Sequence, residues 1–182
     1  MEEKKAIEVC SHFVLGDTAR KLLTPELTAG KYLQLLIQNK QYIDAVRLLA
    51  YALPTKEAIM WANSCARQFC EANPAEKLSA AVDAVDRWLA EPNDENRRAA
   101  LKAAEGAEFG TPPGSSALAV FFSSGSLAPP DAPVIPPDKD QAANAVVGAV
   151  LLSAIFKEPE KAEDRYQAFL EQGRKIAATV KV

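Results

Sequence analysis

The stretch Tyr42–Cys70, YIDAVRLLAYALPTKEAIMWANSCARQFC, decides how this chain folds. Its apolar residues recur at the spacing of amphipathic helices on both sides of Pro54. Proline lacks a backbone N–H and restricts the residue before it, so Pro54 predicts the end of one helix and a tight turn into the next. The first helix, over about residues 41–53, is apolar on most faces, which predicts a central position. The second shows an apolar face made of Ile59, Ala62, Ala66 and Phe69.

The same periodicity continues outward in both directions and predicts an all-α protein, an irregular bundle of about eight helices. Helix starts are predicted where a capping residue precedes an apolar repeat, since its side-chain oxygen accepts from a free backbone N–H. The clearest start is Asn73-Pro74-Ala75-Glu76, and further starts are predicted at Asp17, Thr28, Asn93 and Thr111. A short alternating piece over residues 9–15 is the one hint of a strand.

Composition excludes several classes of protein. The 182 residues are 48% hydrophobic and 25% charged, as in a folded domain with its own core. Nine basic and eight acidic residues over 1–72 give +1, and the remaining 12 basic and 16 acidic residues give −4, so neither part carries a cationic field. Nucleic acid is therefore not an expected partner, because phosphate binding needs clustered Lys and Arg.

Reactive and metal-binding residue types are sparse. The three cysteines, Cys10, Cys65 and Cys70, have no metal-ligand spacing, which favours reduced thiols in the cytoplasm. His12 is the only histidine, which removes most general-base arrangements and any His-rich metal site. We therefore expect no metal, no cofactor and no enzymatic activity. Residues 142–156 form the longest uncharged helical segment and are too few to span a bilayer, so we expect a core helix and no membrane partner.

The chain divides into four parts of one domain. Residues 1–16 are expected to be poorly ordered or peripheral, 17–122 to form the helical core, 123–137 to form a proline-rich strap, and 138–182 to form a helical hairpin packed on the core. Five of the twelve prolines lie between 129 and 137, which favours extended backbone. We expect the strap to be held to the body by Leu127, Val134 and Ile135. The alternatives are a docking peptide and an interdomain linker.

One group of residues has the composition of an interaction surface. Tyr, Trp and Arg dominate the binding energy of protein interfaces, and five candidates of this kind lie on the decisive stretch: Tyr42, Arg47, Lys56, Trp61 and Arg67. Each has a competing structural role. For Trp61, at the turn between two helices, the core role is favoured over that of an exposed anchor. The two arginines can pair with Asp44 or Glu71 on their own helices.

These observations favour a protein interaction module whose partner is another protein. The first alternative is an enzyme or small-molecule binder whose site is assembled from distant residues, with Cys65, Arg67 and Glu57 as its participants. The second is a structural homo-oligomer that associates through the alanine-rich faces around Ala100 and Ala145. The sequence leaves the oligomeric state open.

A resemblance extends over most of the chain, from Ala19 to about Leu170. The matching blocks are the run from Tyr42 to Ala62 with Cys65-Ala66-Arg67, then Glu95–Ala100, Phe109–Pro112 and Gly125–Pro130. In these blocks the sequence resembles a family of uncharacterised bacterial proteins that tend to occur near type VI secretion genes. The resemblance implies a cytoplasmic accessory or adaptor of a secretion system, with a secretion component or an effector as partner. It implies no catalytic residues.

Overall fold

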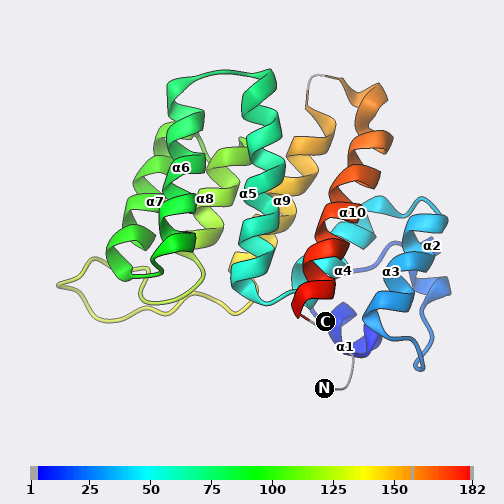
Figure 1. The fold of residues 1–182 in the computed structure, drawn as a ribbon. Helices are drawn as coiled ribbons and strands as arrows, with labels where there is room; N and C mark the ends of the chain where they lie inside the picture. Colours follow the sequence, from blue (N-terminus) through cyan, green and yellow to red (C-terminus); the bar gives the residue numbers. More distant parts are fainter. Residues whose placement is uncertain (1–3, 157, 181–182) are drawn as a thin grey trace.

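The fold is built from α-helices throughout the part that the structure, a computed structural model, describes, which is residues 4–156 and 158–180 (Figure 1). The helices are α1 (Ala6–Cys10), α2 (Asp17–Leu22), α3 (Ala29–Gln38), α4 (Tyr42–Ala52), α5 (Thr55–Ala72), α6 (Glu76–Ala90), α7 (Asp94–Ala107), α8 (Pro112–Phe121), α9 (Gln141–Ile155), the 3₁₀ turn η1 (Pro159–Lys161) and α10 (Ala162–Val180). The predicted all-α class is confirmed.

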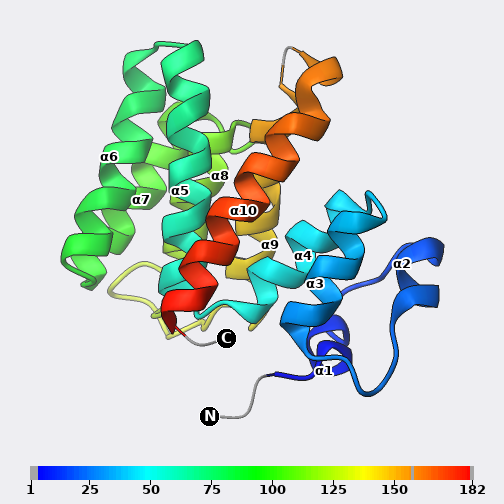
Figure 2. The same ribbon diagram turned by 45° about the vertical axis from the view of Figure 1, so that its right-hand side comes forward.

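The helices form two groups joined by one continuous core. Helices α5, α6, α7, α8 and α9 lie side by side with roughly aligned axes, and α1, α2, α3 and α4 gather at the other end of the molecule (Figures 1 and 2). Helix α10 lies between the groups and contacts α4, α5 and α9. The main cluster of buried apolar side chains runs from Ala6 in α1 to Leu170 in α10, so both groups share it.

The stretch that contains Pro54 folds as its pattern predicts. Leu53 has extended backbone before Pro54, so the chain turns directly from α4 into α5. Helix α4 is buried on most of its faces, and the predicted apolar face of α5, from Ile59 to Phe69, is buried. The turn thus places two helices in the middle of the molecule.

Three predicted helix starts have the expected caps. The side chains of Thr28, Asn93 and Thr111 accept from the backbone N–H three residues on, at 3.4, 2.8 and 3.1 Å. The Asp17 prediction is shifted by one residue, since Asp17 is the first residue of α2 and Gly16 is its N-cap.

The predicted start at Asn73 is wrong. Asn73 follows the last residue of α5, where its side-chain amide donates to the carbonyl oxygen of Phe69 at 3.0 Å. It therefore serves a free carbonyl of the helix before it, and α6 begins at Glu76 with Ala75 as its N-cap.

The N-terminal segment packs more closely than its sequence indicates. Ala6, Val9, Cys10 and Leu15 are buried, and the backbone of Ala6 donates to Leu27 at 2.9 Å. The hint of a strand over residues 9–15 is wrong, because α1 and a turn occupy this stretch. The part of residues 1–16 that the structure describes is therefore docked against α3 and α4.

The C-terminal helices α9 and α10 both contact α4 and α5. Helix α10 buries Tyr166, Phe169, Leu170 and Gly173. Within the described ranges, no single helix combines the length and apolar character needed to cross a membrane, although α9 taken together with Pro159–Val180, bent by 111°, passes by length and composition.

Candidate functional site

Trp61 of the predicted interaction surface belongs to the core. Its side chain is 0% exposed, and its indole Nε1 donates to the carbonyl oxygen of Phe169 at 2.8 Å. Gly173 of α10 packs directly over the indole, where an added Cβ would lie 2.9 Å from Cε2. Trp61 therefore joins α5 to α10, and the competing core role is the one that the structure shows.

Tyr42, Arg47 and Arg67 also join helices or chain segments. Tyr42 is 9% exposed, stacks on Tyr166 at 5.7 Å and donates to Glu163 at 3.2 Å. Arg47 pairs with Asp44 as expected, at 3.3 Å, and also donates to the carbonyl of Val14.

Arg67 pairs with Asp86 of α6 at 2.5 Å, where Glu71 was the expected partner. Lys56 is exposed at the start of α5. These roles within the protein leave the five candidates without a common exposed surface.

The cysteine and alanine residues of the two alternative hypotheses lie in or near the core. Cys65 is 0% exposed, and burial raises the pKa of its thiol far above the ordinary value, so no substrate reaches a thiolate there. Burial and then the carboxylate of Asp44 raise the pKa of Cys10 to about 12. Ala100 is 0% exposed and therefore offers no surface to a second copy, and Ala145 packs partly buried against the core.

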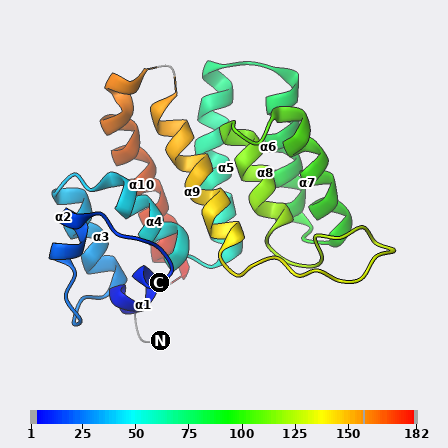
Figure 3. The ribbon, with the colours of Figure 1, turned by 180° about the vertical axis from the view of Figure 1, so that it is seen from behind.

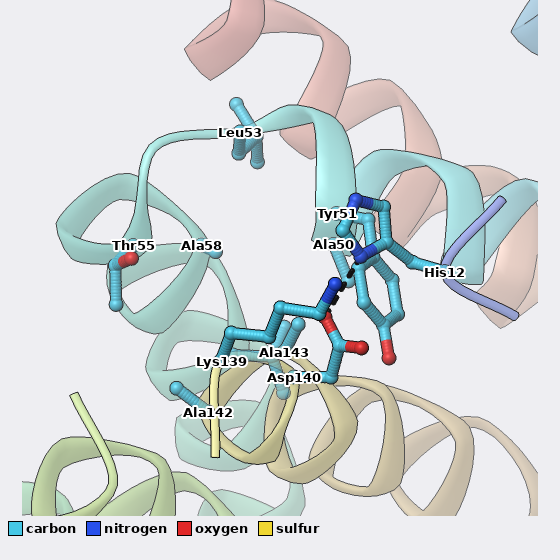
Figure 4. Close-up of a pocket in the computed structure, with 11 residues that line it drawn as sticks. His12, Ala50, Tyr51, Leu53, Thr55, Ala58, Lys139, Asp140, Ala142 and Ala143 are labelled. Atoms are coloured by element: carbon cyan, nitrogen blue, oxygen red, sulfur yellow. Dashed lines mark hydrogen bonds and ion pairs between the residues drawn. The ribbon is translucent and has the colours of Figure 1, made fainter. Parts of the chain in front are cut away.

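A polar cavity lies where the N-terminal segment meets the α4–α5 turn and the start of α9 (Figure 4). It has a volume of about 150 Å³ and combines an apolar wall with His12, Tyr51, Thr55, Lys139 and Asp140. His12 Nδ1 lies 2.9 Å from Asp140 Oδ1, and the imidazole stacks on the ring of Tyr51 at 5.5 Å.

Sequence reasoning missed this site. Its central pair is separated by 128 residues, and neither partner lies in a recognisable motif. Tyr51 donates to Asn144 Oδ1 at 2.8 Å, and burial followed by the charge of Asp140 raises the pKa of its phenol. The polar groups of this cavity therefore come together only when the chain folds.

The proline-rich segment is anchored by two arginines at the start of α7. Arg97 is 1% exposed and donates to the carbonyl oxygens of Phe121 at 2.8 Å and Ser126 at 3.0 Å. Arg98 donates through two nitrogens to the carbonyl of Ala128, both at 3.1 Å. Asp94 binds both guanidinium groups, at 2.6 and 2.7 Å, and so fixes them as one clamp.

Beyond the clamp the segment forms a closed loop. The backbone N–H of Leu127 donates to the carbonyl of Ile135 at 2.7 Å, and the hydroxyl of Ser126 accepts from the N–H of Ile135 at 3.0 Å. The loop leaves the body at the end of the bundle where α7 begins (Figures 1 and 3).

The predicted anchoring by three apolar side chains is wrong for two of them. Val134 is 77% exposed and Ile135 is 55% exposed, and Leu127 alone is partly buried. The polar clamp holds the backbone instead. The hydrogen bonds of Ile135 to Leu127 and Ser126 close the loop through the backbone, so the side chains of Val134 and Ile135 are free to face solvent.

Among residues 4–156 and 158–180, no group of three or more His, Cys, Asp and Glu side chains is arranged to hold a metal ion. A family model matches residues 32–177, most of the chain, and its description is a family of unknown function. No curated protein and no solved structure matches the sequence.

Proposed function

The chain belongs to DUF6931, a family of unknown function, and from this premise we propose that it is a protein interaction module. The observation that carries the proposal is the loop over residues 127–135, which is clamped at its base and exposes Val134 by 77% and Ile135 by 55%. Exposed aliphatic side chains on a fixed loop are suited to insertion into the pocket of a partner.

The backbone of this loop favours one mode of recognition. Proline fixes its own φ, and it restricts the residue before it to extended or polyproline conformations. In Ala132–Pro137 every residue except Val134 is a proline or precedes one. Pro133 and Pro136 also have the spacing of a PxxP ligand, which docks in grooves lined by aromatic side chains. We infer that the partner is a protein with such a groove.

Because the clamp holds the loop in shape, it favours tight binding of the loop to a partner. Binding a flexible segment costs the entropy of ordering it, and a segment already held in shape avoids most of that cost. Arg97 and Arg98 hold three backbone carbonyls of the chain entering the loop. The partner therefore meets a preorganised surface.

For the identity of the partner we propose a component or effector of a secretion system, with this protein as its cytoplasmic adaptor. The support is the resemblance of the blocks from Tyr42 to Pro130 to proteins encoded near type VI secretion genes. No enzymatic activity is part of this proposal.

The test is capture of partners from the native cells with tagged protein, followed by mass spectrometry. The wild type is compared with the double variant Val134→Ser/Ile135→Ser and with the control Val14→Ser, which removes a valine that is also 77% exposed. Such surface substitutions change stability by no more than about 0.5 kcal/mol. The proposal predicts a protein that binds the wild type and the control and is lost from the double variant.

A partner that the double variant retains would overturn the role of the loop. Identification of the loop-dependent protein as a secretion component would support the adaptor assignment. A loop-dependent protein of another kind would refute that assignment and keep the interaction module.

A further inference from the structure

The cavity beside His12 is large enough for a small organic ligand. Its volume is about 150 Å³, and an engineered protein cavity of about this volume holds benzene, a molecule of six heavy atoms. Its lining combines the aliphatic side chains of Ala50, Ala58 and Val146 with polar groups from the N-terminal segment and from the start of α9. Figure 4 shows His12 and Asp140 pointing toward each other beside Lys139. A ligand for this cavity therefore combines polar groups with a short apolar part.

The pairing of His12 determines which hydrogen bonds remain available. The carboxylate of Asp140 only accepts, so the Nδ1 of His12, 2.9 Å away, carries the proton and donates. Nε2 of the neutral imidazole is then an acceptor, and it has no hydrogen bond to any residue in the described ranges. The cavity thus offers an acceptor for a hydroxyl group.

Lys139 supplies a positive charge to the lining of the cavity. Its ammonium group makes no ion pair or hydrogen bond with residues 4–156 or 158–180, and its side chain extends toward His12 and Asp140 (Figure 4). The carboxylate of Asp140 is already engaged by His12. Lys139 is exposed to solvent and is the cation of the cavity lining, so it suits one carboxylate group, whereas a polyanion would meet the charges of Asp140 and Asp138.

We propose that this cavity binds a small hydroxycarboxylate. The carboxylate pairs with Lys139, the hydroxyl donates to Nε2 of His12, and the aliphatic part lies on the wall formed by Ala50, Ala58 and Val146. Binding here is independent of the proline-rich loop, and it requires no metal ion. A ligand of this size binds in the millimolar range, since affinity is limited by the number of atoms in contact.

The experiment uses the one histidine as a reporter. Because the chain has a single histidine, the imidazole proton resonances in NMR spectra are assigned without ambiguity. The 182-residue protein at about pH 8 is titrated with lactate and with propionate, which lacks the hydroxyl. We expect a saturable shift of the His12 resonances with lactate and binding of propionate weaker by about fivefold, the value of one neutral hydrogen bond.

Two lysine variants test the charge. Lys139→Ala should weaken lactate binding by about tenfold, because it removes a charge-assisted hydrogen bond. Lys77→Ala, which removes an exposed lysine of α6, should leave binding unchanged while altering the net charge equally. No saturable shift with lactate up to about 50 mM, equal binding of propionate, or equal binding by Lys139→Ala would each overturn the proposal.

Discussion

Replacement of Arg97 by alanine should destabilise the protein more than a surface substitution does. The side chain is 1% exposed, and its guanidinium donates to Asp94 and to the carbonyl oxygens of Phe121 and Ser126. It also lies 4.8 Å from the centre of the Phe121 ring. Alanine would leave both carbonyls without this donor and would open a cavity between α7 and the end of α8.

The size of the effect follows from these contacts. Breaking a buried charged pair costs about 3–5 kcal/mol when the partner stays buried. The partner here, Asp94, is 59% exposed and can be hydrated after the substitution. Two carbonyls that lose a charged donor contribute about 1–3 kcal/mol each where they are buried. We therefore expect a loss near the lower limit of the buried-pair range, about 3 kcal/mol, which lowers Tm by roughly 6–12 °C in a chain of this length.

Urea unfolding followed by tryptophan fluorescence measures this loss, provided that the m value stays constant. Arg87→Ala is the matched control, because Arg87 is an exposed arginine of α6, and it should shift the free energy by no more than about 0.5 kcal/mol. Hydrogen exchange of residues 126–136 should rise in the Arg97 variant. A loss below about 1 kcal/mol, or unchanged exchange in the loop, would refute the assignment of Arg97 as the anchor.

Three further predictions concern other parts of the fold. Gly173→Ala should destabilise by about 1 kcal/mol in urea titrations, because crowding against Leu49 and Trp61 outweighs the gain in helix propensity. Gly106→Ala, with open space around it, should be neutral or stabilising. Cys65 should not react with a thiol reagent at neutral pH until the protein is unfolded, and rapid labelling of the native protein would contradict its burial. Hydrogen bonds from Arg98 and Arg97 lower the pKa of Asp94. The stability that these bonds contribute is therefore present above the unfolded pKa of about 3.9 and is lost as the pH falls through the lower folded pKa. Urea midpoints should accordingly fall less for Asp94→Asn than for the wild type below about pH 4, and equal losses would refute the linkage.

Competing hydrogen bonds account for the wrong predictions at Asn73 and in the proline-rich loop. Asn73 has the pattern of an N-cap, yet its side chain reaches back to Phe69, because α5 extends to Ala72 and leaves its last carbonyls to be satisfied. Val134 and Ile135 are apolar and were expected to anchor the segment, yet arginines of α7 hold its backbone and both side chains are exposed. In both cases a competing hydrogen bond decided the outcome.

The sequence by itself determined the helical class and most helix positions. The apolar repeat, the break at Pro54 and the caps at Thr28, Asn93 and Thr111 act within one or two helix turns, so their energies depend on neighbours along the chain. Such local signals can be read without knowledge of the packing.

Only the tertiary structure decided which groups meet. It placed Trp61 against Phe169, closed the proline-rich loop on Arg97, and brought His12 to Asp140 across 128 residues. The physical reason is that a contact between distant residues forms only after the helices between them have packed, and that packing depends on the whole apolar surface at once.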